Sequence, residues 1–190
     1  MVDTPMGLLL YVPICSLDGF VSDPDGDHDW GEPSPDVFAF LNELQERIGT
    51  ELYGRRTYEV MSVWETDPAL AEADGHAGDF AQWWQRTEKV VYSTTLTEVT
   101  TSRTRLEPSF DPEAVRRLKA ESPGDLSVFG PTLASHAFAA GLVDELHLVL
   151  SPMIIGGGLR ALPAQRLQLS LLEECRFEDG TVYLRYAVGS

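Results

Sequence analysis

Short apolar runs alternate with amphipathic segments along most of the chain. The apolar runs predict strands at residues 8–15, 50–53, 89–93, 103–106, 126–129 and 145–150. The segments between them predict helices over residues 35–48, 56–63, 80–86, 112–120 and 133–140. Such alternation is typical of an α/β domain whose mixed, mostly parallel central sheet is flanked by helices on both faces.

The pattern changes near the C-terminus. Two strand-like segments, residues 167–177 and 181–188, are joined by an Asp179-Gly180 turn, which predicts an antiparallel hairpin. Residues 67–78 contain few large apolar side chains and are expected to form a mobile surface loop. We find no linker or repeat, so residues 1–190 are interpreted as a single domain.

Composition narrows the classes of partner. The chain has 190 residues, 43% of them hydrophobic, and 14 basic residues against 30 acidic ones, for a net charge of −16. This charge repels nucleic acids and anionic membranes, so a small-molecule partner is expected. The sequence lacks a membrane-span pattern and a metal-type Cys/His cluster, which predicts a cytoplasmic protein with no bound metal. Cys15 and Cys175 lie in apolar segments and are expected to be buried free thiols.

A glycine followed by basic and hydroxyl residues, Gly54-Arg55-Arg56-Thr57, lies between a predicted strand and a predicted helix. Unpaired N–H groups at a helix start and two guanidinium groups are suited to phosphate binding. In a chain this acidic, locally concentrated cations are the way to hold an anionic ligand. An ordinary strand–turn–helix with solvated arginines explains the segment equally well.

A second glycine-led helix start is formed by Gly130-Pro131-Thr132-Leu133. Both turns follow predicted strands, and ligands of open α/β sheets lie beyond the carboxyl ends of strands. The two turns are therefore candidates for holding two ends of one elongated anion. The Gly130–Pro131 bond admits either isomer, and a plain connection without a ligand remains an alternative.

Two aspartates are candidates for acid chemistry. Asp18 follows the first strand beside Gly19, where its carboxylate can point into a cleft or form an Asx-turn. Asp36 follows Ser34-Pro35 at the start of a predicted helix. It is suited to proton donation if the helix borders the cleft, and otherwise it complements the helix dipole.

Five segments in order resemble the dihydrofolate reductase superfamily, specifically the branch similar to the RibD C-terminal domain, the reductase domain of bacterial riboflavin biosynthesis. They cover nearly the whole chain: Ser16-Leu17-Asp18-Gly19, Leu52-Tyr53-Gly54-Arg55-Arg56-Thr57-Tyr58-Glu59, Val128-Phe129-Gly130-Pro131-Thr132-Leu133, Gly141-Leu142-Val143-Asp144-Glu145-Leu146-His147-Leu148 and Pro152-Met153-Ile154-Ile155-Gly156-Gly157-Gly158.

The resemblance implies an NADPH-dependent reductase that transfers hydride to a small heterocyclic or ribosylaminopyrimidine-type substrate, as in 5-amino-6-(5-phosphoribosylamino)uracil reductase. It also implies a homodimer. It assigns the adenosine-side phosphates to Gly54, Arg55, Arg56 and Thr57, with Arg55 nearest the 2′-phosphate. It assigns the adenine end to Ser93 and Thr94, the pyrophosphate to Gly130, Pro131, Thr132 and Leu133, and the nicotinamide and substrate end to Ile14, Asp18, Gly19 and Val21.

In this interpretation Asp18 polarises the hydride acceptor, and Asp36 or a water supplies the proton. Two alternatives remain: a non-catalytic NADPH-binding sensor and a broad-specificity carbonyl reductase. The sequence shows no second basic cluster for a phosphate on the substrate.

Overall fold

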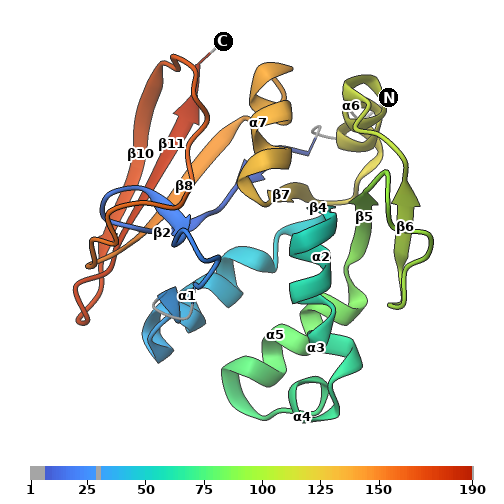
Figure 1. Ribbon diagram of the computed structural model, residues 1–190, viewed down its shortest axis with the longest axis horizontal. Coiled ribbons are helices and arrows are strands. Elements are labelled where there is room, and N and C mark those ends of the chain that lie inside the picture. The colour runs from blue at the N-terminus through green and yellow to red at the C-terminus, as the bar shows by residue number, and fades with distance from the viewer. Residues whose placement is uncertain (1–6, 29–30, 190) are drawn as a thin grey trace.

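A mixed sheet forms the centre of the protein in the computed structural model, which describes residues 7–28 and 31–189 (Figure 1). Its nine strands follow the order β10-β11-β8-β1-β7-β4-β5-β6, and β2 pairs with β8. The strands are β1 (Leu9–Tyr11), β2 (Ile14–Ser16), β4 (Ile48–Gly54), β5 (Glu88–Tyr92), β6 (Thr104–Glu107), β7 (Asp125–Phe129), β8 (Glu145–Ser151), β10 (Leu169–Arg176) and β11 (Val182–Val188). The pairs that involve β11 are antiparallel and the others are parallel, so the predicted fold class is confirmed.

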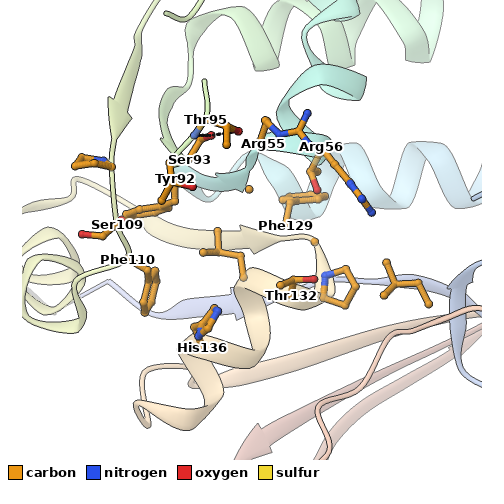
Figure 2. A pocket seen from close by; sticks show the side chains of 18 residues that line it. Arg55, Arg56, Tyr92, Ser93, Thr95, Ser109, Phe110, Phe129, Thr132 and His136 are labelled. Atoms are coloured by element: carbon orange, nitrogen blue, oxygen red, sulfur yellow. Dashed lines mark hydrogen bonds between the residues drawn. The ribbon is translucent and has the colours of Figure 1, made fainter. Parts of the chain in front are cut away.

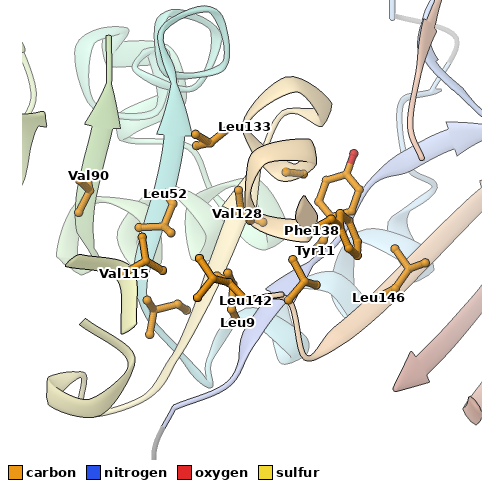
Figure 3. Packing of buried hydrophobic residues seen from close by; sticks show 14 residues of the cluster. Leu9, Tyr11, Leu52, Val90, Val115, Val128, Leu133, Phe138, Leu142 and Leu146 are labelled. Atoms are coloured by element: carbon orange, nitrogen blue, oxygen red, sulfur yellow. The ribbon is translucent and has the colours of Figure 1, made fainter. Parts of the chain in front are cut away.

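Helices cover both faces of this sheet (Figure 1). On one face lie α6 (Pro112–Glu121) and α7 (Pro131–Ala139), and on the other lie α1 (Pro35–Gln45), α2 (Arg55–Met61) and α5 (Gly75–Arg86). Adjacent residues of the central strands point to opposite faces, which explains why their sequences are continuously apolar. Leu9 and Leu52 pack in the α6–α7 layer (Figure 3), whereas the next residues, Leu10 and Tyr53, pack beside α5.

The first strand is shorter than predicted because proline interrupts it. Pro13 has no N–H group to donate to a neighbouring strand, and the expected strand over residues 8–15 divides into β1 and β2 on either side of it. The helix predicted over residues 35–48 ends at Gln45, since Ile48 already belongs to β4 and is buried beside α5.

The expectation that residues 67–78 form a loop is wrong. The segment contains α4 (Pro68–Ala71) and the first turn of α5. Asp67 caps α4 by accepting a hydrogen bond from the Ala69 N–H at 2.9 Å. Gly78 lies so close to the Ala73 carbonyl that a Cβ would be 2.0 Å from its oxygen. Close backbone packing therefore orders a segment that has few large side chains.

The C-terminal hairpin is confirmed, with β10 and β11 antiparallel. Three short elements were not predicted: α3 (Val63–Thr66) and a two-stranded sheet of β3 (Phe20–Ser22) with β9 (Leu159–Arg160). Both cysteines are free, with Cys15 buried and Cys175 half-buried. Within the described ranges, no helix is long and apolar enough to cross a membrane.

Candidate functional site

The two glycine-led turns meet at the carboxyl ends of β4 and β7. Gly130 has a φ of +88°, and a Cβ at this position would lie 2.6 Å from Thr57 Oγ1. Its backbone conformation and this contact both exclude larger residues. The peptide bond between Gly130 and Pro131 is trans, since no cis peptide bond occurs in the described part of the chain. The turns that were predicted to act together are thus in direct contact.

Gly54, in the other turn, differs from Gly130. Its φ of −80° suits any residue, and no atom beyond the adjacent residues of the chain would lie within 4 Å of an added Cβ. Neither backbone conformation nor packing within the protein therefore requires glycine at this position. The open space beside Gly54 belongs to a cavity of about 590 Å³, the polar chamber (Figure 2).

Most of the residues predicted to bind the cofactor line this polar chamber. They come from the ends of β4, β5 and β7 and the starts of α2 and α7: Gly54, Arg55, Arg56, Thr57, Ser93, Thr94, Gly130, Pro131, Thr132 and Leu133. The sequence interpretation missed Tyr92, Phe110 and His136 in the same wall. The Tyr92 and Phe110 rings meet edge to face with centroids 5.3 Å apart, and burial raises the pKa of Tyr92 to about 12. A planar group can pack against this aromatic edge.

The two arginines differ in their pairing. Arg55 Nη1 donates to both carboxylate oxygens of Glu59, at 2.8 and 3.0 Å, one helical turn further along. Arg56 has no hydrogen-bond or ion-pair partner within residues 7–28 and 31–189, and it lines both the polar chamber and a neighbouring cavity. Its guanidinium group is therefore free to bind an anion at the junction of the two.

The neighbouring cavity and a hollow beside it form what we call the apolar chamber. The two parts measure about 710 and 640 Å³ and share Ile14, His28, Leu41, Gln45, Val60 and Phe129. Ile14 and Val21, predicted to face the nicotinamide and substrate, line this chamber. The rest of the wall combines aliphatic and aromatic residues, among them Tyr11, Val12, Pro13, Phe38, Met61, Trp64 and Phe80, with the polar or charged residues Ser22, Glu32, Asn42, Arg56, Thr57 and Glu59.

Asp18 lies outside the described walls of both chambers, and its carboxylate is already hydrogen-bonded. It accepts from Ser16 Oγ at 2.7 Å and from the N–H groups of Ile155 at 3.2 Å and Gly156 at 2.8 Å. The Ser16 hydroxyl and these N–H groups hold the pKa of Asp18 below its usual value. Gly19 is also outside the walls, and its carbonyl accepts from the Ala161 N–H at 2.9 Å. Through these hydrogen bonds, Asp18 and Gly19 join the loop between β2 and β3 to the residues on either side of β9.

Asp36 is exposed in the first turn of α1 and belongs to the described walls of neither chamber. The inward face of the helix instead presents Phe38, Leu41, Asn42 and Gln45. These residues have the spacing i, i+3, i+4 and i+7 that defines one side of a helix. This spacing is visible in the sequence, so it could have shown that Asn42 and Gln45 lie on the same side of the helix as Phe38 and Leu41.

A buried polar network behind the polar chamber was also missed. Glu51 is fully buried in β4, where it accepts hydrogen bonds from the Tyr53 hydroxyl and, at 3.2 Å, from Ser127 Oγ. Burial raises the pKa of Glu51 to about 8, although the Ser127 bond and the nearby Lys89 act in the opposite direction. Tyr53 also contacts the Phe129 ring, with centroids 5.5 Å apart. The network therefore supports the wall that separates the two chambers.

This architecture and the position of the cleft define a protein with a dihydrofolate reductase-like fold. Dihydrofolate reductase from Enterococcus faecalis, in a structure complexed with NADP(H), superposes with a TM-score of 0.62 at 13% identity, over 97% of this chain and 98% of that one. A putative riboflavin biosynthesis protein from Shewanella sp. PV-4 gives a TM-score of 0.74 at 20% identity, over 96% and 99% of the two chains.

The chain belongs to the RibD C-terminal domain family, whose model matches residues 9–183. This confirms the family resemblance carried by the five motifs. YyaP of Bacillus subtilis, an uncharacterized protein, is 28% identical over 174 residues, which cover 90% of this chain and 89% of YyaP.

Proposed function

We propose that this protein is an NADPH-dependent reductase that transfers a hydride to a small heterocyclic acceptor. Membership of the RibD C-terminal domain family supports a reductase of the riboflavin-pathway type. The NADP(H) named for the dihydrofolate reductase relative supports a nicotinamide cofactor. The observation that carries the proposal is the contact between Gly130 and Thr57, which brings both glycine-led helix starts to one cleft that Arg56 also lines.

The residues of the cleft fit such a cofactor. The open space at Gly54 leaves room for a ligand to approach the backbone, and α7 directs its N-terminal N–H groups toward the same chamber. We assign the 2′-phosphate to Arg55, on the side of Ser93 and Thr94, and the pyrophosphate to Arg56 at the chamber junction. When bound, the nicotinamide would supply the hydride, so the protein's task is binding and orientation.

Side chains of the apolar chamber would orient the two reactants and exclude water. Ile14 and Val21 present aliphatic surface on the nicotinamide side, and Phe129 lines both chambers. Asp18, through Ile155 and Gly156, would hold the loop that precedes β9. Its predicted role as an acceptor-polarising group, the predicted role of Asp36 as proton donor and the predicted homodimer all remain untested predictions.

The cofactor assignment is tested by titrating NADPH and NADH into Arg55→Ala and Arg56→Ala and following nicotinamide fluorescence. Arg55→Ala should weaken NADPH about tenfold and leave NADH unchanged, since a bidentate arginine on the 2′-phosphate distinguishes the two cofactors. Arg56→Ala should weaken both by roughly 10- to 100-fold, the usual range for hydrogen bonds to a charged group.

Arg86→Ala is the matched control, because Arg86 is exposed and pairs with Glu46 away from both chambers. It should change neither affinity. Equal losses of NADPH and NADH in Arg55→Ala would remove the 2′-phosphate assignment, and failure of the wild-type protein to bind either cofactor would remove the proposed function.

A non-catalytic NADPH sensor is the second candidate, and the positions of the two aspartates favour it. Neither Asp18 nor Asp36 belongs to the described walls of the chambers. A sensor would bind NADPH without oxidising it in the presence of pteridines, aminopyrimidine-ribitol compounds or simple carbonyl compounds. Oxidation with any of these acceptors would establish an enzyme.

A further inference from the structure

The reduction proposed for this protein needs a proton as well as a hydride, and a histidine lines the chamber at the acceptor end. Among the described residues, His28 is the one histidine in the walls of the apolar chamber, and it lines both parts. Ile14, assigned to the nicotinamide side, also lines both parts. Asp18 and Asp36, the acids expected from the sequence, lie outside these walls. The position of His28 therefore suits a proton donor.

The loop that carries His28 is closed by its own hydrogen bonds. Asp23 Oδ1 accepts from the N–H groups of Asp25 and Asp27, both at 2.9 Å, and the Asp23 N–H donates to the Asp27 carbonyl at 2.9 Å. Nδ1 of His28 lies 3.5 Å from the Gly26 carbonyl oxygen, at the outer limit of a hydrogen bond, and Nε2 has no partner within the described residues. Nε2 is therefore the ring nitrogen left to contact a ligand.

Other titratable side chains of the chamber are less suited to proton transfer. The Tyr11 hydroxyl donates to the Ala161 carbonyl at 2.8 Å, and burial raises its pKa. Arginine keeps its proton at any working pH, which excludes Arg56. Glu59 accepts from Arg55 with both carboxylate oxygens. Histidine, by contrast, ordinarily changes its charge between about pH 5 and 8.

Most of the charged groups around His28 are carboxylates. They are Asp23, Asp25 and Asp27 in its loop, Glu32 after it, and Glu59 of α2 in the same chamber, where Arg56 is the cation. Ordinary carboxyl and guanidinium groups do not change their charge between about pH 6 and 8. A rate that changes in this range therefore distinguishes His28 from its charged neighbours.

We propose that His28 is a catalytic residue that donates a proton to the acceptor in the apolar chamber. This role rests on the proposed reductase function. The acceptor is then a compound with a C=N or C=O bond. An N–H bond of the His28 imidazolium breaks, a new N–H or O–H bond forms on the acceptor, and the carbon of the same double bond receives the hydride that NADPH supplies. The neutral imidazole is exposed and takes its next proton from solvent.

The position of His28 can be tested without turnover, by proton NMR of the histidine rings. NADP⁺ should shift the His28 resonances, because the nicotinamide would lie in the chamber that His28 lines. 2′-Phospho-ADP-ribose lacks the nicotinamide and should leave them unchanged, although it should shift the resonances of His136 in the polar chamber. His76, exposed at the start of α5, is the internal control and should shift with neither ligand.

Kinetics test the role itself. His28→Gln should lower kcat roughly 100- to 1,000-fold at pH 7, with the pteridine, aminopyrimidine-ribitol or carbonyl acceptor that is reduced fastest, while NADPH affinity is unchanged. The wild-type kcat should fall as pH rises from about 6 to 8, and His28→Gln should lose this dependence. Added imidazole should restore part of the turnover of His28→Ala. His76→Gln is the matched control and should behave like the wild-type protein.

Three results would overturn the role of His28 and leave the reductase intact: NADP⁺ binding without a shift at His28, wild-type turnover in His28→Gln, or an unchanged pH dependence in that variant. A wild-type protein that binds no NADP⁺, or that oxidises NADPH with none of these acceptors, gives a different outcome, since the reductase and the role of His28 then fail together.

Discussion

The two chambers of the cleft are built in different ways. The polar chamber is lined by two turns that touch at Gly130 and Thr57 and by side chains from outside them, such as Tyr92, Ser93 and Phe110. The apolar chamber adds side chains from one face of α1, namely Phe38, Leu41, Asn42 and Gln45. Backbone contacts of this kind depend on glycine at one position, whereas side-chain walls can change residue by residue. If the proposed function holds, the comparison predicts that the fold determines the end that binds the cofactor and that individual side chains determine the end that binds the acceptor.

The largest expected effect comes from Gly130→Ala. An added Cβ would lie 2.6 Å from Thr57 Oγ1 and would force a non-glycine residue to a φ of +88°. A left-handed conformation costs about 1–2 kcal/mol and the collision adds to it, so the free energy of unfolding should fall by roughly 2 kcal/mol or more. NADPH should bind on the order of 100-fold more weakly, because the two turns must separate. Denaturant unfolding and fluorescence titration measure the two quantities.

Gly54→Ala is the paired control in the other turn. With a φ of −80° and no atom beyond the adjacent residues within 4 Å of the new Cβ, the free energy of unfolding should stay within about 0.5 kcal/mol of wild type. NADPH affinity should still fall about tenfold, because the methyl group would occupy space assigned to the ligand. Wild-type NADPH affinity in Gly54→Ala would show that the open space is not part of the cofactor site.

A smaller effect is expected from Glu51→Gln, beneath the wall that both chambers share. The pKa of Glu51 is about 8 in the folded protein, above its ordinary value of 4.5, so the folded state binds more protons than the unfolded state between these values. Stability should therefore decrease as pH rises, by about 1 kcal/mol per pH unit between about pH 6 and 7.5. Glu51→Gln should abolish this slope in denaturant unfolding.

Two features keep this test specific. Burial lowers the pKa of Lys89 from 10.5 to about 8. The unfolded state therefore binds more protons at this residue, and its contribution to stability increases with pH above about pH 8. Glu88→Gln, an exposed change on the neighbouring strand, should retain the wild-type slope. If Glu51→Gln leaves the pH dependence of the unfolding free energy unchanged, Glu51 is not the group that causes it.

The sequence predicts the fold well where local patterns determine it. Apolar runs identified the central strands, and Asp179-Gly180 identified the hairpin of β10 and β11. The errors fall where tertiary contacts decide. Close packing of Gly78 on the Ala73 carbonyl helps to order residues 67–78, and the short β3 and β9 form strands only because they meet across the sequence.

The polar chamber was more predictable than the apolar one for the same reason. Glycine turns leave a local signal, so Gly54 and Gly130 were identified together. The choice of Asp18 and Asp36 rested on their positions after a strand and at a helix start, which do not specify where a side chain points. The structure places Gln45 and Asn42 on the inner face of the helix and Asp36 on its exposed side.

The smallest effect is expected from Asp18→Asn, which separates a positioning role from the catalytic role predicted by sequence. Asparagine keeps the shape but weakens the bonds to Ile155 and Gly156, so their amide hydrogens should exchange severalfold faster while NADPH affinity is unchanged. Because the folded pKa of Asp18 is lowered, its stabilising effect is present above its ordinary pKa and is lost as pH falls through the folded value. The protection that Asp18 gives these two amides in the wild-type protein should therefore be constant between about pH 5 and 8.

Asp179→Asn is the matched control, since Asp179 accepts from the Thr181 N–H at 2.8 Å in the C-terminal hairpin and also has a lowered pKa. It should leave the exchange of Ile155 and Gly156 unchanged. A catalytic Asp18 would give the opposite pattern: turnover would fall by orders of magnitude with unaltered exchange at these amides. Faster exchange with a modest loss of turnover would instead show that Asp18 acts through the loop before β9. Leu159 of β9 lines both chambers. The position of this loop would then help to determine how an acceptor binds.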